Sequence, residues 1–531
     1  MASSSERTDG SAKEPCRYGL QCYRKNPQHL ERFSHPTEEA AESSSGGAEG
    51  GNEGQPPLKK QRIGGRERSS FWFFLTKTEG LAEKWNEDCW SLSDVLKLRG
   101  ADGEAALTAS VHFNFMVDVE WLLKQYELAF GRSAVRPTIG LVVGEKNGTS
   151  YADVQREVEA VKQWSPFVVS VAGAKLPMPF GCHHTKLSLL KYEDGACRIL
   201  ISTANLLESD WTRKTQALYL SPILPRLTAQ DDNSGEELPL VGRQFKQDFL
   251  AYFRSYKDGR QYGAVVSPWV DDLTLCDFSA VRACLVASVP GRHKQADLNS
   301  YGHLKLRQHI SDHCAKKTDG GQRLVVSQCS SIGSLGSVPT QWLTAEFWTS
   351  LNGLKEAKSA PPSLAQFKLV FPTVDDVRNS IEGYCGGASL PYSAATHAKQ
   401  QYLASVFHRW SSEGAGRTRV MPHLKTYCRL TTGSSDEEGT SLDYVVLTSA
   451  NLSKAAWGSL EKDGSQLFLR SYELGVVFFA SCLGLGKMSA ADWLPFDWPL
   501  TKYRSGSDSP WLWDASYDAP DVMGNKWKPK S

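Results

Sequence analysis

The sequence predicts a layered α/β protein in which one domain is duplicated. Apolar runs of strand length alternate with helical patterns from Phe71 to the end of the 531-residue chain, and a pattern of His, Lys, Asn and Trp occurs twice. Alternating strands and helices are typical of sheets covered by helices, and a repeated residue pattern indicates a repeated structural unit. A content of 40% hydrophobic and 22% charged residues is typical of a globular protein.

Residues 13–37 form the first distinctive segment, rich in cysteine, histidine, tyrosine and arginine. Cys16, Cys22, His29 and His35 have the spacing C-x5-C-x6-H-x5-H. Two thiolates and two imidazoles can form a closed tetrahedral zinc site, and metal binding supplies folding free energy to a segment too short for a hydrophobic core. We therefore predict a small zinc finger.

Residues 38–70 are rich in Ser, Gly and Glu and nearly free of apolar residues, which predicts a disordered linker. Its basic run LKKQR (58–62) fits a nuclear localisation signal, although such runs are often only solvated. The sequence shows no apolar core of a secretory signal and no apolar run of membrane-spanning length. Twelve cysteines without a regular spacing favour a reducing compartment. We expect a soluble nuclear protein without membrane contact.

The globular part is expected to comprise two domains, 71–290 and 291–531. Apolar, β-branched runs predict buried strands at Ile139–Val143, Val168–Val171, Arg198–Thr203, Arg323–Ser327, Lys368–Phe371, Tyr444–Ser449 and Gly475–Phe479. Helical patterns are predicted at 116–130, 240–257 and 397–411.

The repeated pattern is an H-x-K triplet, a strand ending in Ala-Asn-Leu, and a tryptophan six residues after the asparagine. The two copies are His184, Lys186, Asn205 and Trp211, and His423, Lys425, Asn451 and Trp457. The acidic insert at 433–440 accounts for the longer second copy. Side chains alternate along a strand, so His and Lys of each triplet should share one face. A single triplet is common, but two copies indicate one shared site.

Two imidazoles, two ammonium groups and two carboxamides suit phosphoryl transfer without a metal. Lys and Asn can stabilise the phosphate oxygens, while one imidazole attacks phosphorus and the other protonates the leaving oxygen. No Asp or Glu cluster lies near the motifs to hold a divalent cation. The formal net charge of +1 excludes a polybasic nucleic-acid binder, so contact with DNA must be local.

The paired H-x-K resembles the phospholipase D superfamily, whose motif is H-x-K-x4-D. This chain departs from the motif because Lys191 and Leu430 stand where the aspartates are expected. The contexts CHHTKLSLL, STANLLESDW, MPHLKTY and TSANLSKAAWG resemble the tyrosyl-DNA phosphodiesterase family over about 71–531, as do SSIGSLG, GGASLPYS and RSYELGVVF. The resemblance implies two pseudo-symmetric phospholipase D-like α/β/α sandwich domains.

The resemblance also implies hydrolysis of the bond between a DNA 3′ phosphate and tyrosine, as left by a stalled type I topoisomerase. It makes His184 the nucleophile that forms a phosphohistidine and His423 the general acid and base, with no catalytic cofactor. The phosphate would be bound by Lys186, Lys425, Asn205 and Asn451. Gln216 and Glu473 match partners of the catalytic histidines, but the sequence leaves open which contacts which.

Two glycine-rich loops, SSIGSLG and YCGGASLPY, could approach phosphates through backbone N–H groups and hydroxyls. Each alone could be an ordinary loop. With the resemblance, the predicted DNA contacts are Ser331, Gly333, Ser334, Ser389, Pro391 and Ser453. Phe180 is predicted to line the site, with core packing as the alternative.

The N-terminal string KEPCRYGLQCYRKNPQHLERFSHP resembles the poly(ADP-ribose)-binding zinc finger. An aromatic ring beside arginine suits stacking on adenine and contact with phosphate, and the predicted contacts are Arg17, Tyr18, Tyr23 and Arg24. The expected partners are DNA 3′ ends with an adduct and poly(ADP-ribose). A monomer is expected, because one chain supplies both half-sites. The alternatives are a phospholipase D-type lipid hydrolase and a catalytically inert poly(ADP-ribose) reader.

Overall fold

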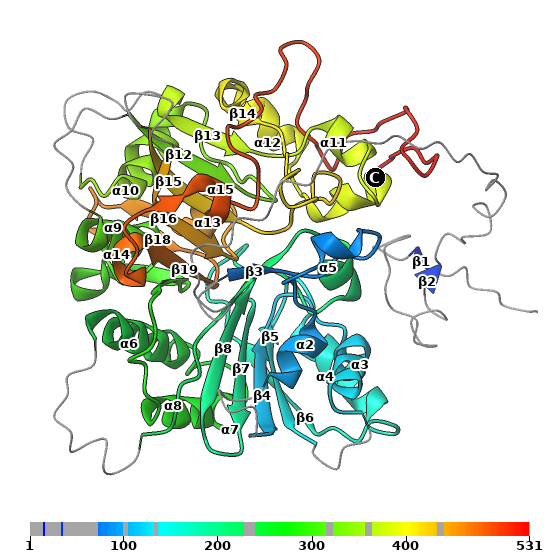
Figure 1. Ribbon diagram of the computed structural model, residues 1–531, viewed down its shortest axis with the longest axis vertical. Coiled ribbons are helices and arrows are strands. Elements are labelled where there is room, and N and C mark those ends of the chain that lie inside the picture. Colours follow the sequence, from blue (N-terminus) through cyan, green and yellow to red (C-terminus); the bar gives the residue numbers. More distant parts are fainter. Residues whose placement is uncertain are drawn as a thin grey trace, which may run out of the picture. The chain divides into compact units, whose positions relative to one another are not determined.

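The computed structural model (Figure 1) describes residues 14–15, 33–34, 73–98, 105–131, 136–227, 239–314, 322–355, 364–432 and 440–529. The chain separates into two compact units, Met1–Phe71 and Trp72–Ser531. In the first unit, β1 (Glu14–Pro15) and β2 (Phe33–Ser34) pair in parallel. The four predicted zinc ligands, the four predicted poly(ADP-ribose) contacts and the linker lie outside the described residues.

Seven strands form the first sheet of the large unit, in the order β3-β9-β8-β7-β4-β5-β6. Their bounds are β3 (Phe73–Leu75), β4 (Leu107–Phe113), β5 (Thr138–Gly144), β6 (Val169–Ala174), β7 (Leu187–Tyr192), β8 (Cys197–Ser202) and β9 (Ala217–Leu220). The pairs from β3 to β4 are antiparallel, and the pairs β4-β5 and β5-β6 are parallel.

The second sheet has the order β10-β19-β16-β15-β12-β13-β14, with β20 added beside β16. Its strands are β10 (Cys284–Ser288), β12 (Gln322–Gln328), β13 (Phe367–Val370), β14 (Phe407–His408), β15 (Thr426–Thr432), β16 (Ser441–Thr448), β19 (Glu473–Phe479) and β20 (Met488–Ser489). Here too the pairs from β10 to β12 are antiparallel, and the last two are parallel.

The two sheets therefore repeat one topology. In each, the first strand of the set lies beside the seventh, followed by the sixth, fifth, second, third and fourth, with the same change from antiparallel to parallel pairing. This agreement supports the duplication predicted from the repeated motif. The first half of the large unit comprises the elements from β3 to α8 (Ser267–Thr274), and the second half comprises those from β10 onward, so the second half begins a few residues before the expected boundary at residue 290. A small sheet of β11 (Gly291–Lys294), β17 (Ser459–Glu461) and β18 (Gln466–Leu469) is added to the second half.

Helices cover the sheets in layers (Figure 1). They are α2 (Leu92–Lys97), α3 (Val119–Phe130), α4 (Tyr151–Val161), α5 (Glu208–Thr212), α6 (Leu240–Arg254), α7 (Tyr262–Val265), α8 (Ser267–Thr274), α9 (Gly302–His313), α10 (Thr349–Leu351), α11 (Val374–Arg378), α12 (Ala394–Lys399), α13 (Lys454–Trp457), α14 (Ala480–Leu483) and α15 (Ala490–Trp493). Helices α2, α3 and α4 share one core with one face of the first sheet. Helices α6 and α8 pack on its other face, in a core continuous with the second sheet. The fold is the expected α/β/α arrangement.

The side chains of β7 show how the sheet is buried on both faces. Leu187 and Leu189 contribute to the core shared with the second half, and Leu190 and Tyr192 contribute to the core under α2–α4. Alternation with period two assigns successive residues to opposite faces. A strand buried on both faces reads as a continuous apolar run. The seven strands predicted from such runs correspond to β5, β6, β8, β12, β13, β16 and β19, whereas β7, whose run is interrupted by Ser188 and Lys191, was not predicted.

The helix predicted at 397–411 is wrong. Helix α12 ends at Lys399, a 3-10 turn follows at Gln401–Ser405, and the segment then enters β14. Gln400 leaves the helical conformation (φ −136°, ψ 49°), and its buried side-chain oxygen accepts a hydrogen bond from Leu335 N at 3.0 Å. The apolar residues whose spacing predicted a helix lie instead in a 3-10 turn and in β14, an edge strand of the second sheet. None of the described helices is both long and apolar enough to cross a membrane.

Candidate active site

Both H-x-K triplets lie directly before a strand, at the points where β7 and β15 begin. The sequence pattern had predicted that the triplets would lie within strands. His184 N donates to Tyr472 O at 3.0 Å, and His423 N donates to Thr215 O at 3.0 Å. These acceptors belong to the opposite half of the molecule. The backbone of each triplet therefore pairs across the junction between the halves before it enters its own sheet.

His184 is held by a carboxylate. Its Nδ1 lies 2.9 Å from Glu473 Oε2, which also accepts a hydrogen bond from Ser449 Oγ at 2.5 Å. The ring packs edge-on against Phe115, with centroids 5.1 Å apart. Because Nδ1–H donates to Glu473, the lone pair of the neutral ring lies on Nε2.

His423 is held by an amide. Gln216 Nε2 donates to Nδ1 at 2.9 Å, and Asp210 Oδ2 lies 3.5 Å from the same nitrogen. Gln216 Oε1 accepts a hydrogen bond from Thr203 Oγ1 at 2.8 Å, while its Nε2 also donates to Asp210 at 3.2 Å, which fixes the orientation of the amide. In the neutral ring of His423 the proton therefore lies on Nε2.

The two partners are exchanged between the halves. Gln216 lies directly before β9 of the first half and contacts His423, whereas Glu473 begins β19 of the second half and contacts His184. This answers the pairing that the sequence left open. Each histidine depends on the opposite half, so the site exists only where both halves meet.

Lys186 and Lys425 are buried beside the histidines, with exposed fractions of 1% and 0%. Lys186 Nζ donates to His184 O at 2.9 Å, and Lys425 Nζ donates to His423 O. Burial lowers the pKa of Lys186 to about 8, against the opposing effect of Glu473 and Asp210. Burial and the charge of Lys186 lower the pKa of Lys425 well below its ordinary value. An anion bound here would stabilise the charged form of both groups.

Burial also lowers the pKa of both histidines. For His184 the carboxylate of Glu473 opposes this effect. For His423 the positive charges of Lys425 and Lys186 add to it, so its pKa falls well below the ordinary value. Both rings are therefore neutral at pH 7 in the free protein. The mutual influence of these groups indicates that they converge on one site.

The two asparagines differ in their partners. Asn205 donates from its backbone N and its Nδ2 to Asp210 Oδ2, at 2.7 and 2.9 Å. Asn451 Oδ1 accepts from Ser330 N at 3.1 Å and from Ser331 N at 3.0 Å. Since its oxygen is occupied by the loop, Asn451 retains its Nδ2 group as the donor for a ligand.

Three predicted contact segments come together around Asn451. Ser331 Oγ donates to Pro391 O at 2.8 Å, and Gly333 N donates to Leu452 O at 2.9 Å. Ser334 and Pro391 are exposed, and Ser389 is half-buried with its hydroxyl donating to Gly386 O at 3.1 Å. Ser453 caps α13 by accepting a hydrogen bond from Ala456 N at 3.2 Å. Hydrogen bonds thus join these loops of the second half to one another beside Asn451.

Phe180 is 86% exposed and has a positive φ of 59°. Core packing, the alternative considered for this residue, is therefore excluded. A large apolar side chain held at the surface in a disfavoured backbone conformation is more typical of a ligand contact than of a structural residue.

Three residues of this region, Asp210, Gln400 and Phe115, were not predicted from the sequence. Asp210 contacts Asn205, Gln216 and His423 together, and its position five residues after Asn205 was the available signal. Burial raises its pKa. Gln400 holds the loop at Leu335 and Gly333. Phe115 lies against His184, with Lys186 Nζ 5.4 Å from the centre of its ring, and no sequence signal marked either residue.

A duplicated α/β fold, with one H-x-K triplet and one asparagine from each half at the junction, defines a phosphodiesterase of the phospholipase D superfamily. Residues 72–508 match the family model described as tyrosyl-DNA phosphodiesterase, and residues 13–38 match the PBZ domain. The chain therefore belongs to the tyrosyl-DNA phosphodiesterase family and carries an N-terminal PBZ domain.

Relatives with these names cover most of the chain. A probable tyrosyl-DNA phosphodiesterase of Caenorhabditis elegans is 34% identical over 488 residues, which are 89% of this chain and 96% of the relative. Tyrosyl-DNA phosphodiesterase 1 of Drosophila melanogaster is 36% identical over 77% of this chain and 68% of the relative. The crystal structure of yeast tyrosyl-DNA phosphodiesterase has the same fold, with a TM-score of 0.61 and 21% identity over 83% of this chain and 99% of that chain.

Proposed function

We propose that this phosphodiesterase hydrolyses the bond between a DNA 3′ phosphate and a tyrosine, the adduct left by a stalled type I topoisomerase, and related 3′ adducts, leaving a 3′-phosphate end. One observation carries the proposal. In each histidine Nδ1 is engaged by a partner from the opposite half, which leaves both Nε2 atoms for chemistry between two buried lysines.

In the first step, the Nε2 lone pair of His184 attacks phosphorus and forms a P–N bond. The bond between phosphorus and the tyrosine oxygen breaks, and that oxygen takes the Nε2 proton of the His423 imidazolium, which keeps its second proton on Nδ1 beside Asp210. Glu473 accepts the Nδ1 proton of His184 in a hydrogen bond and stabilises the positive charge that develops on the ring. The four groups that hold the phosphate oxygens are Lys186, Lys425, Asn205 and Asn451.

In the second step, His423 acts as a base. Its Nε2, which has lost a proton, takes one from water while the water oxygen attacks phosphorus. The P–N bond breaks, releasing the 3′-phosphate and restoring neutral His184. His423 ends this step as an imidazolium and returns to its neutral form once the phosphate has left the site.

Substrate binding itself prepares the acid. Burial and the charges of the lysines lower the pKa of His423 in the free protein. A phosphodiester anion beside the lysines offsets their charge, so that His423 takes up a proton. The imidazolium of His423 then faces Asp210, whose Oδ2 lies 3.5 Å from Nδ1. These charges belong to side chains, so the proposed reaction needs no metal ion.

The DNA strand would follow the loops beside Asn451 and end near Phe180. Hydroxyls and backbone groups of Ser331, Gly333, Ser334, Ser389, Pro391 and Ser453 are the proposed phosphate contacts, and they read no sequence. The exposed ring of Phe180 offers a face for base stacking, worth about 1–3 kcal/mol per base.

The test uses a single-stranded oligonucleotide with a 3′-phosphotyrosine, incubated in EDTA. The wild-type chain should release a 3′-phosphate end, His184→Ala should not, and His293→Gln, a histidine of β11 outside the site, should match wild type. An intact oligonucleotide in the wild-type reaction would overturn the proposal. Hydrolysis of phosphatidylcholine would then support a lipid phosphodiesterase. Inactivity on both substrates would support a catalytically inert poly(ADP-ribose) reader.

For the PBZ domain we propose that Cys16, Cys22, His29 and His35 bind zinc, and that the finger recruits the enzyme to DNA breaks marked with poly(ADP-ribose). The family match over residues 13–38 supports this. The proposed contacts with the polymer are Arg17, Tyr18, Tyr23 and Arg24. Cys22→Ala should lose recruitment to laser-induced nuclear breaks while cleaving the oligonucleotide normally; unchanged recruitment would contradict the role.

We further propose that the protein is nuclear and that LKKQR (58–62) directs it there. Replacing Lys59, Lys60 and Arg62 with alanine should move a fluorescent fusion into the cytoplasm. The result would contradict the proposal if the nuclear fraction of the fusion did not change.

A further inference from the structure

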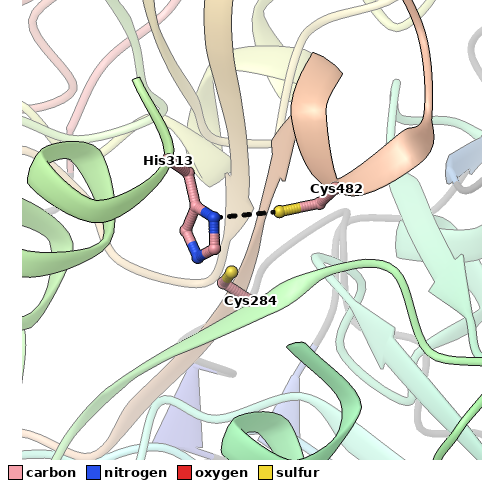
Figure 2. Close-up of side chains that lie close together, drawn as sticks. All are labelled: Cys284, His313 and Cys482. Atoms are coloured by element: carbon pink, nitrogen blue, oxygen red, sulfur yellow. Dashed lines mark hydrogen bonds between the residues drawn. The ribbon is translucent and has the colours of Figure 1, made fainter. Parts of the chain in front are cut away.

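A second cluster of reactive side chains lies outside the active site, where β10, α9 and α14 meet (Figure 2). Cys284 belongs to β10, His313 is the last residue of α9, and Cys482 belongs to α14. His313 Nδ1 lies 3.4 Å from Cys482 Sγ, and the three potential ligand atoms all lie within 4.8 Å of one another. Figure 2 shows both sulfur atoms close to Nδ1 of the imidazole.

The fold brings these residues together from distant parts of the chain. Strand β10 pairs with β19, placing Cys284 opposite Val477, and α14 follows β19 directly. Helix α9 is fixed to β10 by His309, whose Nε2 donates to Leu285 O at 3.0 Å. Ser481 Oγ donates to His313 O at 3.1 Å, which joins α14 to the end of α9. The cluster is therefore held by three elements that are themselves packed together.

The chemistry of the cluster is that of a soft metal site. Thiolates and imidazoles are ligands that Zn²⁺ prefers, whereas Mg²⁺ and Ca²⁺ require oxygen. Zn–S and Zn–N bonds of about 2.3 and 2.0–2.1 Å place two ligands of one tetrahedral ion about 3.5 Å apart. The separation of 3.4 Å between His313 Nδ1 and Cys482 Sγ already fits this geometry. The limit of 4.8 Å leaves only a small side-chain adjustment for Cys284.

Burial supports a specific ion site over a chance encounter. Cys284 and Cys482 are 4% and 8% exposed, while His313 is half-buried. Among the described residues, three or more Cys, His, Asp or Glu side chains come close enough to bind one ion at this cluster alone. The half-exposed imidazole leaves a route for an ion and room for a water molecule.

We propose that Cys284, His313 and Cys482 bind one Zn²⁺ through two thiolates and the Nδ1 atom, with water as the fourth ligand. On binding, the two S–H bonds break, two Zn–S bonds form and two protons pass to solvent. The ion joins the end of α9 to the β10-β19 edge of the second sheet. Glu473 is at the start of β19, whereas Cys482 follows the end of that strand, which is about 20 Å long. The zinc therefore supports the sheet and takes no part in phosphoryl transfer.

The test measures zinc per chain by mass spectrometry of the full-length protein. Because the PBZ domain is proposed to hold its own zinc, every protein carries Cys22→Ser. This background should retain one zinc, and adding Cys284→Ser or Cys482→Ser should remove it. Cys314→Ser is the matched control, because Cys314 follows His313 in the chain but its Sγ contacts Asp443 O. Adding this substitution should leave the zinc in place.

Three readouts keep the test independent of misfolding. Cleavage of the 3′-phosphotyrosine oligonucleotide at 25 °C reports that each variant is folded. Cobalt in place of zinc should give a thiolate-to-metal absorption band, which Cys482→Ser should weaken. Zinc should raise the melting temperature of the background protein but not that of the Cys482→Ser variant. The proposal is overturned if the folded background protein binds no zinc, if it holds Cys284 and Cys482 as a disulfide, or if its zinc survives both serine substitutions.

Discussion

Glu473 and Gln216 give the two histidines of the candidate active site different chemical properties. A carboxylate on Nδ1 makes the opposite nitrogen of His184 a better nucleophile, whereas an amide that donates to Nδ1 of His423 leaves the ring proton on Nε2. Burial alone would raise the pKa of Glu473, but His184 and Ser449 outweigh it and the pKa is lowered. The carboxylate therefore stays ionised over the pH range in which the enzyme would work.

Glu473→Gln should slow formation of the covalent intermediate by about 10²-fold. The amide keeps a hydrogen bond to His184 but loses the negative charge that stabilises the developing imidazolium. Rapid-quench measurement of the intermediate in the His423→Ala background isolates this step. An unchanged rate of formation would show that the carboxylate does not activate His184.

The pH dependence of kcat/KM should report Lys186. An ammonium group is charged below its pKa and neutral above it, so a pKa of about 8 means that phosphate binding weakens as the pH rises through that value. We expect kcat/KM for the 3′-phosphotyrosine oligonucleotide to fall above pH 8. A profile that stays flat well beyond pH 8 would mean that Lys186 keeps its charge, or that its charge is not needed.

At the scale of secondary-structure elements, the loop from Ser330 to Gly336 is positioned by close backbone approach. A Cβ atom on Gly333 would lie 2.6 Å from the Cβ of Ser453 and 3.3 Å from its Cα, so a side chain there would push the loop away from the segment after Asn451. The loop also depends on Gln400, which bonds to Leu335 N and Gly333 O. Small residues here allow the two loops to pack closely.

Gly333→Ala should therefore raise KM several-fold for the oligonucleotide and change kcat less. Gly263→Ala is the matched control, because nothing lies within 4 Å of the Cβ that it would add. Steady-state kinetics of the two variants make the comparison. Equal KM values for both would contradict a role for this close approach in binding DNA.

The sequence predicted those elements whose signals are local. The seven predicted strands read as apolar runs, and the H-x-K and Ala-Asn-Leu signals repeat in the same order, so these strands and the duplication were predictable. The segment at 397–411 was not, because Gln400 is used for a tertiary hydrogen bond that ends the helix. Asp210 was missed for a related reason: its spacing from Asn205 was the one local signal, and its contact with His423 depends on the opposite half.

At the scale of the whole molecule, one chain supplies both halves of the site. The partners exchange across the junction, and Lys214 forms a buried ion pair with Glu382 of the other half. Breaking such a pair leaves an uncompensated buried charge, which is strongly unfavourable. The two halves should therefore fold as one cooperative body.

We expect the enzyme to act as a monomer. Sedimentation analysis over a range of concentrations should give the mass of one chain, and specific activity should not change on dilution. A dimer whose dissociation abolished activity would contradict a site completed within one chain.

The identity of the covalent intermediate tests the two-histidine mechanism most directly. His423→Ala lacks the base that activates water, but the first step should persist because tyrosine is a good leaving group with a pKa near 10. Incubated with the 3′-phosphotyrosine oligonucleotide, digested and sequenced by mass spectrometry, this variant should carry the phosphonucleotide on His184, and the double variant His184→Ala/His423→Ala should carry none. An adduct on another residue, or none in a variant that still releases tyrosine, would contradict the two-histidine mechanism.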